Sequence, residues 1–99
     1  MPTRPPLFSD DGRWVVLEGS ASSHELIVID PKGVVRRSRF SALLDATERA
    51  RIPRTNCGDQ WLEGYRFEGL SVRVSVQQGP EHPPLVFVVD AATGAITRR

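Results

Sequence analysis

One arrangement occurs twice in the sequence, and this repeat constrains the fold more than any other feature. Residues 12–37 and 69–99 each run through a strand-length segment, a polar loop with a histidine, an apolar segment ending in aspartate, a turn, and a short segment ending in Arg-Arg. Apolar segments of this length, separated by turns rich in Gly, Asp and Pro, are typical of consecutive antiparallel strands. The repeat therefore predicts two β-meanders.

The strands of both meanders are predicted from their side-chain patterns. Residues 70–77 alternate between valine or leucine and polar side chains, which is the pattern of a strand with one buried face. Residues 25–30 and 85–90 are apolar on both faces and are expected at the centre of a sheet. The remaining strands are expected at 13–18, 34–38, 61–67 and 95–99, with a two-residue hairpin turn at 68–69.

Between the meanders the pattern changes to helical spacing. Apolar and small residues recur every three or four positions over 39–52, Ser38 or Ser41 is suited to the N-cap, and Pro53 stops the helix. We expect about three turns of amphipathic helix on the sheet face of Val72 and Val74. The residues on its apolar side are Phe40, Leu43, Leu44, Thr47 and Ala50.

The predicted fold class is α+β: an antiparallel sheet of about six to seven strands in two meanders, with one amphipathic helix packed on one face. The 99 residues form one domain. Its parts are an extended lead-in over 1–11, the first meander over 12–38, the helix over 39–52 and the second meander over 61–99.

Two segments resemble blades of TolB-type bacterial β-propellers. The segment FSDDGRWVV (8–16) resembles the Phe-Ser-Pro-Asp-Gly start of a blade, with Asp10 where proline is usual, and VFVVDAATGAITRR (86–99) is similar to the turn that closes one. The resemblance implies antiparallel strands and a tendency to bind other proteins, and it brings no catalytic residues. Because a propeller needs about four blades to close, the two meanders are expected to be rearranged as a single sheet.

Composition narrows the class of protein. The net charge is +1, which provides no general attraction to nucleic acid or membranes. The sequence has no apolar run near the roughly 20 residues that span a bilayer, and its start lacks the apolar segment of a secretory signal peptide. A single cysteine, Cys57, fits a reducing compartment. We expect a cytoplasmic protein that does not bind membranes.

The sequence offers little for catalysis or metal binding. His24 and His82 occupy equivalent loops, but neither has a metal-ligand spacing, and both are expected to be exposed. Cys57 follows the predicted helix at its C-terminal end, where the helix dipole disfavours a thiolate. No phosphate-binding loop or nucleophile motif is present. We therefore expect no enzyme activity, no cofactor and no metal site.

The segment from Arg54 to Glu68 is the predicted partner-binding surface, because Trp, Tyr and Arg concentrate binding energy at protein interfaces. Trp61 and Tyr65 share a strand face, so either is a candidate for the core. The predicted partner is another protein, a toxin or effector that this chain neutralises in the manner of an immunity protein. The predicted contact residues are Arg54, Asn56, Asp59, Trp61, Glu63, Tyr65 and Glu68.

Two alternatives remain from the sequence. The first is a nucleic-acid-binding module, although the aromatic residues that would stack on bases fall in the neighbouring acidic stretch. The second is a homo-oligomer, such as a dimer, in which copies associate edge to edge. The nucleic-acid alternative uses the arginine cluster Arg36, Arg37, Arg39, Arg49 and Arg51.

Overall fold

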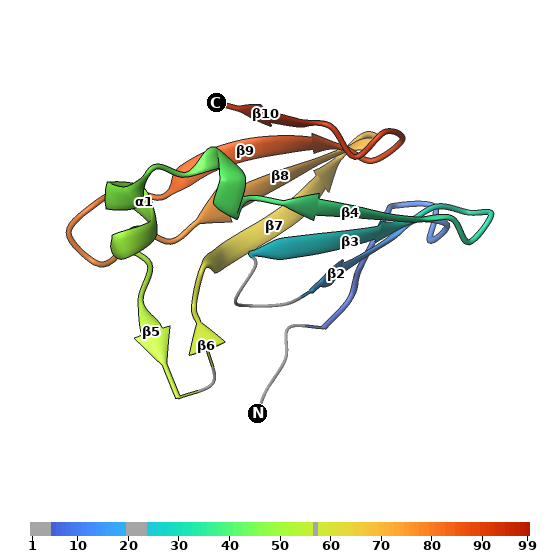
Figure 1. Cartoon of the computed structure of the whole chain (residues 1–99). Helices are drawn as coiled ribbons and strands as arrows, with labels where there is room; N and C mark the ends of the chain where they lie inside the picture. Colours follow the sequence, from blue (N-terminus) through green and yellow to red (C-terminus); the bar gives the residue numbers. More distant parts are fainter. Residues whose placement is uncertain (1–4, 20–23, 57) are drawn as a thin grey trace.

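The computed structural model describes residues 5–19, 24–56 and 58–99, and these residues form two four-stranded antiparallel sheets and one small hairpin (Figure 1). The first sheet has the order β1-β2-β3-β4 and the second the order β10-β9-β8-β7. Each sheet is a meander, as the repeat predicts. The first consists of β1 (Leu7–Phe8), β2 (Val15–Glu18), β3 (Glu25–Ile29) and β4 (Val35–Arg39); the second consists of β7 (Leu62–Glu68), β8 (Ser71–Val76), β9 (Leu85–Asp90) and β10 (Ile96–Arg98).

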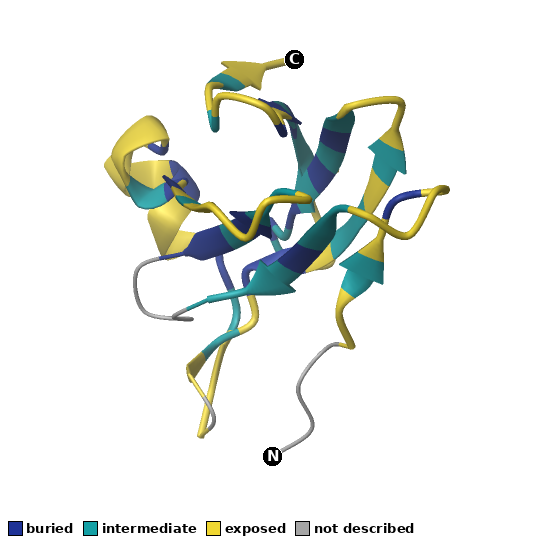
Figure 2. Ribbon diagram, turned by 90° about the vertical axis from the view of Figure 1, so that its right-hand side faces the viewer, coloured by how far each residue is buried: buried dark blue, intermediate teal, exposed yellow. Residues whose placement is uncertain are grey.

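The prediction of a single sheet is wrong, because the two meanders pack their apolar faces against each other. Both sheets contribute fully buried side chains to one core, among them Val28 of β3 and Val74 of β8. The rings of Phe40, Trp61 and Phe87 fill the space between the sheets, with centroids 5.3 Å apart for the first two and 5.4 Å apart for Phe40 and Phe87. Figure 2 shows buried residues on strands of both sheets. Sheet-on-sheet packing buries what the predicted helix was expected to cover.

The predicted central strands are confirmed: β3 lies between β2 and β4, and β9 lies between β8 and β10. Within the predicted lead-in, Leu7 and Phe8 pair with β2 as strand β1. The sheets also approach at both edges. The hydroxyl of Tyr65 donates to Pro5 O at 3.1 Å, and that of Ser38 donates to Gly94 O at 3.1 Å.

The predicted three-turn helix is wrong. A 3₁₀ turn at Ser41–Leu43 is followed by the single short helix α1 at Ala46–Ala50, and Leu44 between them is extended. The N-cap of helix α1 is Asp45 rather than a serine, because Asp45 and Glu48 form a capping box in which each carboxylate accepts the other's backbone N–H. The described chain is therefore sheet-rich and has no amphipathic helix, and Leu43 is exposed.

Two shifts in β7 and its turn change which residues are buried. The hairpin turn lies at residues 69–70, one position later than predicted, since Glu68 pairs with Ser71. Gly69 takes a φ of 65°, which glycine adopts at little cost. Leu70 is therefore exposed instead of facing the core. A register shift between Leu62 and Gly64 also breaks the alternation, so that Trp61 and Leu62 are both buried.

Candidate functional site

A two-stranded hairpin leaves the body of the molecule between α1 and the second sheet. It consists of β5 (Arg54–Thr55) and β6 (Gly58–Asp59), and it projects away from both sheets in Figure 1. Three predicted partner-binding residues, Arg54, Asn56 and Asp59, lie on it. Asn56 is exposed, and the Arg54 side chain is 81% exposed. The hairpin therefore presents a cation and an amide to solvent.

The base of the hairpin is held to the first sheet by a contact between a buried histidine and a partly buried aspartate. The Nε2 atom of His24 lies 2.8 Å from Oδ2 of Asp59, while Oδ1 of Asp59 lies 3.6 Å from Nε of Arg54. The N–H of Gln60 also donates to Pro53 O at 2.8 Å, and this hydrogen bond joins the residues just before β5 and just after β6. One carboxylate thus links an exposed arginine to a buried histidine.

The expectation that both histidines are exposed is wrong for His24, which is only 5% exposed, whereas His82 is exposed. His24 is buried because Asp59 provides a partner for its ring. The ring also lies 5.9 Å from that of Trp61, and His24 takes a φ of 50°, an uncommon conformation for a residue other than glycine. Asp59 lies 35 residues away along the chain, so no local pattern indicates the pair.

The predicted partner-binding residues divide into four groups. Arg54, Asn56 and Asp59 belong to the hairpin. Trp61 is fully buried between the sheets, so its predicted contact with a partner does not fit its position. Tyr65 on β7 is half-buried at the edge of the second sheet, where it contacts Pro5. The two acidic members, Glu63 and Glu68, are exposed on β7.

The arginine cluster divides between β4 and the α1 region, and carboxylates accompany its β4 members. Arg37 and Arg39 contact the two oxygens of Glu25 at 2.9 and 3.3 Å, and Arg36 contacts Asp30 at 3.1 Å. Arg49 instead donates to the carbonyl oxygens of Ser41 and Leu44, and Arg51 is exposed at the C-cap of α1. Glu25 and Asp30 lie outside the basic stretch of the sequence, which is why sequence reasoning missed them.

A second contact that sequence reasoning missed is an ion pair that joins α1 to β10. The guanidinium of Arg98 donates to both carboxylate oxygens of Glu48 and also lies over the ring of Phe87, 5.7 Å from its centroid. The Arg98 hydrogen bond, with the N–H of Asp45 as a second donor, lowers the pKa of Glu48 below its usual value of 4.5. The same carboxylate raises the pKa of Arg98. Glu48 therefore serves the packing of α1 against the second sheet.

Three further observations concern the class of the protein. Over the described ranges, no group of three or more His, Cys, Asp and Glu side chains is placed to hold a metal ion, and Cys57 lies outside those ranges. No helix among the described residues has the length and apolar character needed to cross a membrane. No protein-family model matches the chain, and no significant match occurs among curated proteins or solved structures.

Proposed function

We propose that this protein binds another protein and that the β5–β6 hairpin is the segment that contacts the partner. The observation that carries the proposal is the contact between the buried His24 and the partly buried Asp59, which holds the base of a projecting hairpin. A loop that is already held in its bound position loses less conformational entropy on binding. The hairpin therefore has the features of a preorganised binding element.

The exposed side chains of the hairpin indicate the chemistry of the partner. Arg54 extends into solvent with only a 3.6 Å contact to Asp59, so its guanidinium retains donors for a carboxylate on the partner. Arginine is also among the residues that contribute most to binding at protein interfaces. We place an acidic cleft or patch of the partner opposite Arg54, with Asn56 as a neighbouring amide contact.

The finer proposal is that the chain is an immunity protein, or a similar inhibitor, that neutralises a bacterial toxin or effector in the cytoplasm. One small domain with a preorganised projecting hairpin suits the blocking of a cleft on another protein. The nucleic-acid alternative has less support, because three of its arginines are paired with Glu25 and Asp30. Carboxylates that already neutralise these arginines reduce the positive charge that attracts a phosphate backbone.

The test is affinity capture with nuclease treatment from a lysate of the source organism, comparing the wild-type protein with two variants. Arg54→Glu reverses the charge of the hairpin, and Arg13→Glu makes the same change on the exposed loop before β2. We expect wild type and Arg13→Glu to retain one stoichiometric protein that Arg54→Glu loses. Equal recovery with Arg54→Glu overturns the hairpin proposal, material lost on nuclease treatment supports nucleic-acid binding, and self-association alone supports the oligomer.

A further inference from the structure

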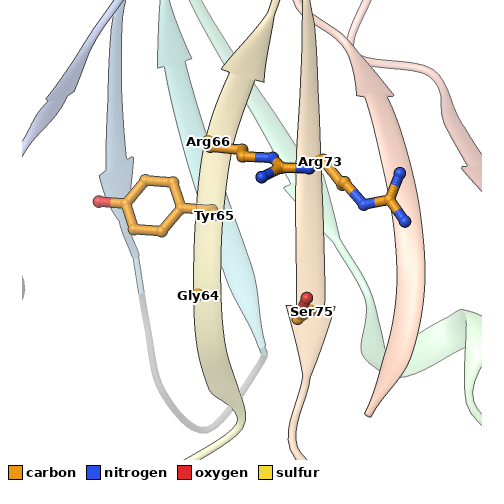
Figure 3. A pocket seen from close by; sticks show the side chains of 5 residues that line it. All are labelled: Gly64, Tyr65, Arg66, Arg73 and Ser75. Carbon is orange, nitrogen blue, oxygen red and sulfur yellow. The ribbon is translucent and has the colours of Figure 1, made fainter.

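A hollow lies on the outer face of the second sheet, at the opposite face from the core. It has a volume of about 310 Å³ and crosses β7 and β8 (Figure 3). The side chains of Arg66 and Arg73 extend in the same direction along this face, whereas Tyr65 leaves β7 on the other side. The residues that line it are Gly64, Tyr65, Arg66, Arg73 and Ser75.

The two arginines are direct cross-strand partners. Arg66 of β7 pairs with Arg73 of β8, which places two positive charges side by side on one face. Like charges opposite one another destabilise an antiparallel pair unless something compensates for them. A bound anion would therefore relieve the repulsion between the two guanidinium groups.

A carboxylate of the protein compensates these two charges only in part. A single oxygen of Glu68 lies 3.6 Å from Nε of Arg66 and 3.7 Å from NH1 of Arg73. Both distances exceed those of charge-assisted hydrogen bonds, and the described residues provide these two guanidinium groups with no hydrogen bond. One carboxylate thus faces two cations, and most of their N–H donors remain available.

The neighbouring cross-strand pair leaves room for a ligand. Gly64 pairs with Ser75, so a position without a side chain lies opposite one with a small hydroxyl group. A Cβ added at Gly64 would meet nothing within 4 Å. The hollow therefore combines two planar cationic groups and a hydroxyl donor around open space, which is the donor set that oxyanions take.

We propose that this hollow binds an oxyanion, the phosphate or carboxylate group of a small ligand, between Arg66 and Arg73 with Ser75 as a third donor. The site is separate from the β5–β6 hairpin, so it does not depend on the proposed function. Because the Arg66 side chain is 70% and the Arg73 side chain 40% exposed, we expect affinity in the millimolar range.

The test is NMR titration of the ¹⁵N-labelled protein with inorganic phosphate and, separately, with acetate, at constant ionic strength. We expect saturable shifts of the Gly64 and Ser75 amides and of the Arg66 and Arg73 side-chain signals. Arg73→Gln should weaken binding about tenfold, because it removes charge-assisted hydrogen bonds. The anion with the lower dissociation constant identifies the chemistry of the ligand.

Three further variants separate binding from general effects. Gly64→Val keeps both charges but fills the hollow, and it should abolish saturation; Ser75→Ala should weaken binding without changing the charge. Glu68→Gln removes the competing carboxylate and should tighten binding. Arg13→Gln, a charge-matched change elsewhere, should leave the titration unaltered. Shifts that never saturate, or binding that is unchanged in Gly64→Val and Arg73→Gln, overturn the proposal.

Discussion

The imidazole of His24 lies 2.8 Å from the carboxylate of Asp59, and this contact joins the residue before β3 to the last residue of β6. His24 is almost fully buried, and its Nδ1 atom has no hydrogen-bond partner among the described residues. Asp59 is therefore the hydrogen-bond partner of the Nε2 atom alone. Because Asp59 also belongs to the hairpin, the pair connects the core to the proposed binding element.

The first prediction concerns this pair. Asp59→Ala leaves the buried ring of His24 without its Nε2 partner, which costs about 1–3 kcal/mol. We expect faster amide hydrogen exchange at residues 54–59, with little change in strand β8. Hydrogen-exchange mass spectrometry measures both regions in one experiment, so β8 is the internal control. Unchanged exchange in the hairpin would show that other contacts hold it in place.

The second prediction concerns Trp61, whose ring packs against those of Phe40 and His24. Trp61→Ala should reduce the free energy of unfolding by about 3–5 kcal/mol, because it leaves a cavity between the sheets. Trp61→Phe should cost less, since it keeps a ring and removes an indole N–H that has no partner in the described part of the chain. Denaturant unfolding measures both, and a smaller loss for alanine than for phenylalanine would contradict the burial of Trp61.

The third prediction is a pH dependence that arises from Glu48. The hydrogen bonds from Arg98 and from the N–H of Asp45 lower the pKa of Glu48 in the folded state, so the fold favours the ionised form. The stabilisation is present in full above the usual value of 4.5 and is lost as the pH falls through the folded-state pKa. Stability should therefore decrease on acidification in this range.

The variant Glu48→Gln isolates this contribution. Glutamine can keep the capping box with Asp45 but has no charge for Arg98. We expect Glu48→Gln to be less stable than wild type near neutral pH and to lose less stability on acidification. Thermal unfolding from neutral to acidic pH tests this, and parallel curves for the two proteins would refute the role of Glu48.

The fourth prediction concerns the edge where β4 meets the β9–β10 turn. The hydroxyl of Ser38 is buried and donates to Gly94 O, so Ser38→Ala should cost about 1 kcal/mol. Ser71→Ala on the outer side of the second sheet is the matched control and should cost less. Equal unfolding free energies for the two variants would mean that the Ser38 contact does not join the sheets.

Local patterns predicted the strands well and the helix poorly. The alternation over Val72, Val74 and Val76 reflects burial of one strand face, and all three side chains are buried as expected. The spacing of Phe40, Leu43 and Leu44 also resembles a helix, but Leu44 is extended and ends the 3₁₀ turn. The extended Leu44 and the capping box at Asp45 therefore interrupt the predicted helix.

The candidate sites also divide into residues that the sequence indicates and residues that only the strand register brings together. Sequence reasoning selected the segment that contains Arg54, Asn56 and Asp59, because Trp, Tyr and Arg concentrate binding energy at interfaces. It overlooked Arg66 and Arg73, because each is an ordinary polar residue of an alternating strand until the hairpin register places them together. The turn shift to residues 69–70 decides that register.

The sequence by itself determined the two meanders and their central strands, because side-chain alternation acts over a few residues. Only the tertiary structure decided that the meanders stack as two sheets, that Trp61 belongs to the core and that His24 meets Asp59. Those outcomes depend on which apolar faces bury one another, and that choice is made between residues far apart along the chain.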